Sequence, residues 1–309
     1  MSKRGLYGIL ISFLVLTSCV GVRSPETRGT PPARPSVDVP RAVPSGLRDT
    51  HEMLYAVLWM QTSAEYGALA RSVYVLARKA LDTALADPGW TAALEQQGRA
   101  PLPDKTAVIL DIDETVLDNS PFEAQIILDG KPYDDAAWKK WVCQGKADEV
   151  PGALEFVRYA QSLGVTVFYI SGRDAETPGD HKSLQEQATR RNLEALGFAF
   201  PPGEDTVLLK NENQGWGSDK SSRRAYVAQS YRILLLIGDD LGDFLSGVKT
   251  DISLRKDKAE EHQDLWGRGW IVLPNAMYGS WEGALFGYDQ KLPDEQALRL
   301  KKSRLRGTN

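Results

Sequence analysis

The sequence predicts an α/β fold in which helices cover both faces of a parallel sheet. Continuous apolar segments at 106–110, 165–170 and 233–237 are typical of strands that are buried on both faces. Segments with helical spacing alternate with these strands, and that alternation indicates a parallel sheet. Each of the three strands ends in acidic or hydroxyl residues, so the sheet should gather them at its carboxyl edge, where open α/β folds bind ligands.

The other elements follow in chain order. Residues 50–86 are rich in Ala and Leu at helical spacing, and we expect a helical hairpin or one long helix there. Residues 118–150, rich in Asp, Gly, Pro and Trp, form an insertion before a helix that starts near Pro151, and this insertion is placed to act as a partial lid. Beyond it we expect strand 165–171, helix 183–196, strand 206–210, helix 220–229, strand 233–238 and a last strand near 270–273.

The first strand delivers two aspartates, Asp111 and Asp113, to its carboxyl end. Neighbours in an extended chain face opposite ways, so these two side chains share one side. Two carboxylates emerging from a buried strand are costly to leave unpaired, and a divalent cation would offset that cost. A carboxylate pair around a metal ion suggests phosphoryl chemistry, although Asp-x-Asp alone is also common in turns.

Three further strand ends strengthen this interpretation. The apolar run 233–237 leads directly into Asp239 and Asp243, and the run 165–170 leads into Ser171. Lys220 precedes a predicted helix that follows strand 206–210. Taken singly, each residue favours a simpler interpretation, a turn residue for Ser171 and a solvated surface cation for Lys220. Together, the order Asp-x-Asp, Ser, Lys, Asp along one sheet edge predicts a phosphate site.

This order resembles the haloacid dehalogenase (HAD) superfamily, and within it the class C acid phosphatases. These are bacterial surface lipoproteins that include outer-membrane lipoprotein 5′-nucleotidases. Segments 111–122 and 237–244 are similar to the two signatures of that family, and segments 59–66, 138–141 and 273–282 extend the resemblance to roughly 50–290. The resemblance implies a HAD-like, Rossmannoid parallel sheet with a small helical cap insertion. Asp240 and Gly172 stand where the family usually has Asn, and Phe122 stands where it has Tyr.

The family's catalytic roles can be carried over residue by residue. By resemblance, Asp111 is the nucleophile that forms an aspartyl-phosphate, and Asp113 protonates the leaving alkoxide and then deprotonates water. Ser171 and Lys220 would hold the phosphoryl oxygens. Lys210 is the alternative for the lysine role, and Lys220 is preferred because it precedes Ser-Ser-Arg-Arg.

Magnesium is the expected cofactor, because the ligand set offers only oxygen atoms. Asp111, Asp239 and the main-chain carbonyl of Asp113 would bind Mg²⁺. Asp243, four residues beyond Asp239, is expected to orient metal-bound water. The predicted metal site therefore comprises four residues: Asp111, Asp113, Asp239 and Asp243.

Aromatic residues are expected to set the specificity. By resemblance, Tyr133 and Trp138 in the insertion and Tyr278 near the end correspond to positions that stack a nucleobase or another ring, and Arg173 is assigned to substrate binding. Stacking tolerates different bases, so nucleoside monophosphates are the expected substrates among small phosphomonoesters. The alternative is that such rings pack the core or a hinge, which is the preferred interpretation for Trp141 and Trp281.

The amino terminus reads as an export signal with a lipid anchor. Lys3 and Arg4 precede an apolar run of about 11 residues, which is short for a membrane span and typical of a signal peptide. The sequence Leu-Thr-Ser-Cys19 resembles a bacterial lipobox, and an ordinary secretory signal with an incidental cysteine is the alternative. We therefore expect a signal peptide at 1–18, a lipidated Cys19 with a Pro-rich tether at 19–48, and a phosphatase domain at 49–309. Val20, rather than Asp, favours the outer membrane.

Composition excludes some other classes. The net charge is −4 and the chain has no basic tract with interleaved aromatics, so no nucleic-acid partner is expected. With Cys19 lipidated, Cys143 has no partner for an intrachain disulfide. One competing function is phosphotransfer to another alcohol by the same site. Another is that of a non-catalytic surface lipoprotein that binds a host factor or haem. The chain has three histidines, which offer few ligands for haem. The sequence leaves open whether the chain forms a homodimer.

Overall fold

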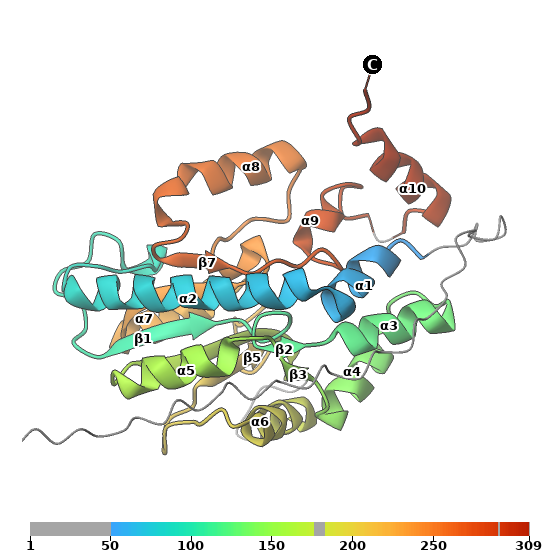
Figure 1. Cartoon of the computed structure of the whole chain (residues 1–309). Helices are drawn as coiled ribbons and strands as arrows, with labels where there is room; N and C mark the ends of the chain where they lie inside the picture. Colours follow the sequence, from blue (N-terminus) through green and yellow to red (C-terminus); the bar gives the residue numbers. More distant parts are fainter. Residues whose placement is uncertain (1–50, 176–182, 290, 309) are drawn as a thin grey trace, which may run out of the picture. The chain divides into compact units, whose positions relative to one another are not determined.

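A five-stranded parallel sheet lies at the centre of the computed structural model, which describes residues 51–175, 183–289 and 291–308 (Figure 1). The strand order is β5-β4-β1-β6-β7, and each neighbouring pair runs parallel. The strands are β1 (Thr106–Leu110), β4 (Thr166–Asp174), β5 (Val207–Lys210), β6 (Arg232–Gly238) and β7 (Trp270–Val272). β1 is therefore central, between β4 and β6, and all five carboxyl ends face one edge.

The residues of each strand are divided between two separate hydrophobic clusters, one on each face of the sheet, and they alternate except at Leu234 and Leu235 of β6. On β1, Val108 and Leu110 belong to one cluster, and Ala107 and Ile109 belong to the other. This two-sided burial explains why the strands read as continuous apolar segments rather than as alternating ones. The predicted α/β fold with covered faces is confirmed.

The first cluster is covered by α2 (Ala64–Ala86), α5 (Ala153–Ser162) and α6 (Leu184–Leu196), and the second by α7 (Ser221–Ser230) and the short helix η1 (Leu94–Gln96) (Figure 1). A separate helix α1 (Leu54–Thr62) precedes α2. The two are divided at Ser63, whose extended backbone breaks the helix and whose hydroxyl accepts the Tyr66 N–H at 3.1 Å. Inside α2, the buried Tyr74 hydroxyl donates to the Thr115 carbonyl and so ties this helix to the loop after β1.

The expected insertion contains two helices and a short hairpin. α3 (Ser120–Asp129) packs against α1, and α4 (Asp135–Gln144) packs against α6. At the base, β2 (Leu117–Asp118) pairs antiparallel with β3 (Asp148–Glu149). The insertion thus leaves the sheet at the carboxyl end of β1 and returns to it at α5.

The carboxyl-terminal third adds η2 (Leu241–Asp243), α8 (Ile252–Glu261), η3 (Gln263–Leu265), α9 (Ser280–Gly283) and α10 (Asp294–Ser303). Neither α8 nor α9 was expected from the sequence. α8 contains no buried residue, so it lacks the apolar stripe from which helices are inferred. In the part of the chain that is described, no helix is long and apolar enough to cross a membrane. The expectations for 1–18 and 19–48, Cys19 included, lie outside the described residues.

Candidate active site

Asp111 lies at the carboxyl end of β1, close to the centre of the sheet edge. Its N–H donates to the Ile237 carbonyl of β6 at 2.8 Å, and the residue is only 8 % exposed. Lys220, immediately before α7, donates to Asp111 Oδ1 and to Asp243 Oδ1, the latter at 2.6 Å. A partly buried ammonium group therefore joins the first strand's aspartate to the second acidic motif.

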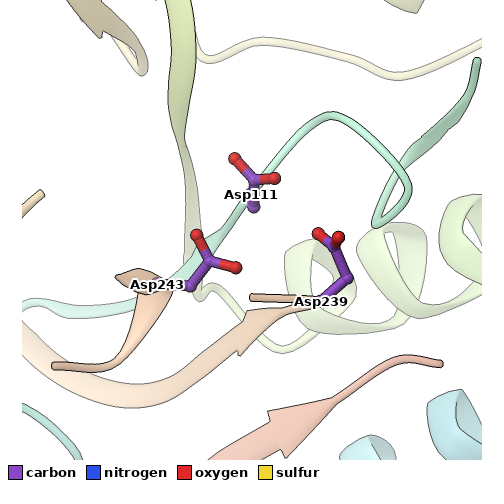
Figure 2. A group of neighbouring side chains, drawn as sticks. All are labelled: Asp111, Asp239 and Asp243. Atoms are coloured by element: carbon purple, nitrogen blue, oxygen red, sulfur yellow. The ribbon is translucent and has the colours of Figure 1, made fainter. Parts of the chain in front are cut away.

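Three carboxylates meet at this edge. Single oxygens of Asp111, Asp239 and Asp243 all lie within 4.8 Å of one another, and Figure 2 shows the three side chains pointing toward a common space. Asp239 is held from two sides: Thr115 Oγ1 donates to one oxygen at 3.1 Å, and Asn275 Nδ2 donates to the other at 2.9 Å. These two donors come from the loops after β1 and β7.

Burial and mutual repulsion disfavour the charged carboxylates. Burial, opposed by Lys220 and assisted by Asp243 and Asp113, raises the pKa of Asp111 to about 7. Burial and the neighbouring carboxylates also raise the pKa of Asp239 well above its ordinary range, and burial raises the pKa of Asp243. Burial alone would favour the neutral amine of Lys220, but Asp111 and Asp243 outweigh it and raise the lysine pKa. The ammonium group thus stays charged.

The donor set suits a hard divalent cation. When ionised, the three carboxylates carry three negative charges, and Lys220 supplies one positive charge. Two negative charges therefore remain uncompensated. Oxygen-only ligands are those that Mg²⁺ and similar ions prefer. Asp111, Asp239 and Asp243 are therefore the residues that would hold such an ion.

The second aspartate, Asp113, lies in a tight loop beside this cluster. The Ile112 carbonyl accepts the N–H groups of Val116 and Leu117, both at 2.8 Å. Within this loop, Glu114 adopts a left-handed φ of 56°. The Arg173 guanidinium of β4 donates to Asp113 Oδ1 at 3.0 Å from Nε and 2.8 Å from Nη2. Buried Ser171 lies near the other oxygen, with its Oγ 3.5 Å from Asp113 Oδ2.

Two buried arginines bind backbone carbonyls around the site. Arg223 donates to the carbonyls of Ser171 and Leu208, and Arg224 donates to the Asp243 carbonyl at 3.0 Å and to Glu95 at 2.9 Å. No role was expected from the sequence for these two arginines, or for Thr115 and Asn275. The Arg-Arg pair after Lys220 and the motif positions of Thr115 and Asn275 were visible signals, but nothing local showed which groups they would reach.

Comparison with known proteins identifies the family. Residues 41–281 match the family model of the HAD superfamily, subfamily IIIB (acid phosphatase). The chain belongs to this family. The family model and two similar solved structures confirm the prediction of a class C acid phosphatase. The same solved structures confirm the prediction of a HAD-like fold.

Two solved structures of the class C acid phosphatase from Bacillus anthracis are similar to this chain. The first is 34 % identical to this chain, with a TM-score of 0.69, and the match covers 83 % of this chain and 98 % of the B. anthracis chain. The second, with tungstate bound, has 32 % identity, a TM-score of 0.69 and the same coverage.

Plant proteins are more distant relatives. Acid phosphatase 1 of Solanum lycopersicum is 30 % identical over 55 % of this chain and 57 % of its own, and a stem 28 kDa glycoprotein of Glycine max is 27 % identical over 46 % and 54 %. The matching segment thus spans little more than half the length of these two relatives.

In this member of the acid phosphatase family, the expected aromatic residues fall into separate surroundings. Phe122 on α3 is the centre of a ring cluster: Trp138 lies at 5.2 Å, Tyr133 at 6.2 Å and Trp141 at 6.5 Å between centroids. Tyr133 is 55 % exposed, whereas Trp138 and Trp141 are half-buried. Tyr278, also half-buried, packs against a cluster around α1, against which Ala124 and Ile127 of α3 also pack.

The remaining assigned and alternative residues are also located. Lys210 forms an ion pair with Asp174 at 3.0 Å, whereas Lys220 occupies the carboxylate cluster. Asp240 accepts hydrogen bonds from Ser280 N at 2.6 Å and Ser280 Oγ at 2.8 Å, so its carboxylate faces α9. A Cβ added at Gly172 would meet no atom within 4 Å, so the backbone leaves room there for the first atom of a side chain.

Cation binding should stabilise this protein more at alkaline than at acidic pH. When folding raises the pKa of a carboxyl group, that group contributes stability at low pH. The contribution of Asp111 is lost as the pH rises through its folded pKa of about 7. A cation that competes with the proton restores it. We expect saturating Mg²⁺ to raise the melting temperature by about 5 °C or more at pH 8 and by clearly less at pH 5, measured by calorimetry after chelation.

Asp239→Asn is the matched variant, because it removes one charge from the cluster while preserving side-chain size. It should lose most of the Mg²⁺-induced shift at pH 8. A shift of equal size in Asp239→Asn and in the unaltered protein would show that the cation binds elsewhere.

Proposed function

We propose that this chain is a Mg²⁺-dependent phosphomonoesterase that acts through an aspartyl-phosphate on Asp111. The observation that carries this proposal is the buried contact of Lys220 with both Asp111 and Asp243, beside an aspartate cluster suited to a divalent cation. Membership of the acid phosphatase family supports the same reaction.

The chain's own groups account for both displacements. Asp111 attacks phosphorus, and the bond to the leaving alkoxide breaks as Asp113 donates its proton to that oxygen. Asp113 then takes a proton from water, which hydrolyses the aspartyl-phosphate. Lys220 and Ser171 stabilise charge on the phosphoryl oxygens. A bound divalent cation would lower the repulsion between Asp111 and the anionic substrate.

Asp111→Asn should lower kcat/KM for phosphomonoesters by at least about 10³-fold, because an amide is a poor nucleophile. Phosphate release from a panel of monoesters measures this, and circular dichroism checks the fold. Asp264→Asn, an exposed aspartate of the carboxyl-terminal third, is the control and should retain turnover. A folded Asp111→Asn protein with undiminished turnover would exclude the aspartyl-phosphate, and full activity after exhaustive chelation would exclude the cation.

Nucleoside monophosphates are the proposed substrate class. Tyr133 supports this, since it is an exposed ring at the rim of the insertion, edge-on to Phe122 with an interplanar angle of 83°. Tyr278 is a second, half-buried candidate. A nucleobase that stacks on such a ring gains about 1–3 kcal/mol, whichever base it is.

Tyr133→Ala should lower kcat/KM for a nucleoside monophosphate by roughly 5- to 150-fold, the kinetic equivalent of that stacking energy. A small alkyl phosphate has no ring to stack and should be almost unaffected. Tyr226→Ala is the matched control, because Tyr226 is 49 % exposed and also lies edge-on to a ring, that of Trp216. Equal proportional losses on both substrates would assign Tyr133 to packing.

The proposed location is the outer membrane, through a lipid on Cys19, and it rests on the sequence alone. Cys19→Ala should abolish palmitate labelling and release the protein from the membrane fraction. Cys143→Ala is the control, since Cys143 is an exposed free thiol in the described domain and should leave labelling intact. Labelling that persists in Cys19→Ala would identify another site.

A further inference from the structure

Arg173 is a buried side chain whose contacts differ from those of a substrate-binding arginine. It is 2 % exposed, and each of its three guanidinium nitrogens has a protein partner. Nε and Nη2 both donate to Asp113 Oδ1, and Nη1 donates to Thr189 on α6 at 2.8 Å. The planar donor fork is thus directed at the proposed acid and at the helix beside it.

The hydrogen bonds to Asp113 are unevenly distributed between its two oxygens. Oδ1 accepts two bonds from Arg173 and a third from Asn119 Nδ2 at 2.9 Å. Oδ2 has only longer contacts, with Arg173 Nε at 3.3 Å and Ser171 Oγ at 3.5 Å. Because donors occupy Oδ1, Oδ2 is the oxygen that can carry a proton and give it to a leaving group.

Both residues that hold Oδ1 are in turn covered by α4 of the insertion. The Arg173 guanidinium lies over the Trp138 ring, 5.8 Å from its centroid. Trp141, one turn further along the helix, donates from Nε1 to Asn119 Oδ1 at 2.8 Å. One helix of the insertion therefore contacts each of the two donors that orient the acid.

We propose that Arg173 and Asn119 are positioning residues that hold Asp113 by Oδ1, so that Oδ2 transfers the proton, and that α4 sets this geometry through Trp138 and Trp141. The proposal rests on the phosphomonoesterase function above. It gives Trp138 a role in placing the acid rather than in stacking a substrate ring. Binding or movement at the insertion would reach the chemistry by this route.

The consequence is a selective dependence on the leaving group. An alkoxide must receive a proton as its bond to phosphorus breaks, whereas a nitrophenolate leaves readily without one. Damage to the acid's position should therefore slow hydrolysis of an alkyl phosphate and spare p-nitrophenyl phosphate. Loss of phosphate binding or of general stability would slow both alike.

The experiment measures kcat/KM on both substrates for the full chain with Mg²⁺ present. General acid catalysis contributes about 10²–10⁴-fold, so Asp113→Asn should show the largest alkyl-selective loss. Arg173→Lys and Asn119→Ala should each show an alkyl-selective loss of about 10-fold or more, and Trp138→Leu a smaller one in the same direction. Arg232→Lys is the matched control, because the side chain of this buried arginine donates to the carbonyls of Ala84, Asp87 and Trp90, away from Asp113, and should leave the substrate ratio unchanged.

A double variant makes the test independent of folding losses. In an Asp113→Asn background, Arg173→Lys and Asn119→Ala should no longer alter the ratio between the two substrates, because the group they position is gone. Equal proportional losses on both substrates, or an unchanged selective effect without Asp113, would overturn the proposal. Absence of turnover of either substrate by the unaltered protein would instead refute the phosphomonoesterase function itself.

Discussion

The site depends on three buried or half-buried carboxylates that lie beside a single ammonium group. Asp111, Asp239 and Asp243 would repel one another strongly in this poorly solvated edge, and Lys220 offsets only one of the three charges. The pKa of each carboxyl group is raised as a result. Such an arrangement is stable when protons or a divalent cation supply the missing positive charge, and this requirement links the protein's stability to its proposed chemistry.

Much of the surrounding structure serves to hold these charges in place. Thr115 and Asn275 fix the two oxygens of Asp239, and Arg224 fixes the backbone of Asp243. The Tyr74 hydroxyl reaches the Thr115 carbonyl from the long helix α2. These donors come from four separate segments, so the carboxylate cluster also organises contacts between distant parts of the chain.

The two aspartates after β1 are supported by different parts of the molecule. Asp111 belongs to the cluster formed by β6, η2 and Lys220, whereas Asp113 is bound by β4 and by the first residues of the insertion. The proposed nucleophile is therefore tied to β6, η2 and Lys220, and the proposed acid to β4 and the insertion. The proposed effect of the insertion on catalysis follows from this division of contacts.

The sequence by itself determined the strands and the residues at their ends. Five apolar segments appear as the five strands, because burial on both faces leaves a continuous hydrophobic pattern. Parallel strands bring their carboxyl ends to one edge, so Asp111, Ser171, Lys220 and Asp239 could be grouped before their distances were known. α8 was not predictable in this way, since it buries no residue.

Only the tertiary structure decided which partners those residues have. Strand order places β1 between β4 and β6, and this order depends on long-range pairing that no local pattern encodes. Arg173 was assigned to substrate binding, yet its side chain donates to Asp113 and lies over the Trp138 ring. Local sequence fixes where a side chain begins, but a buried guanidinium goes to whichever carboxylate and ring the fold brings within reach, because leaving it unpaired would be costly.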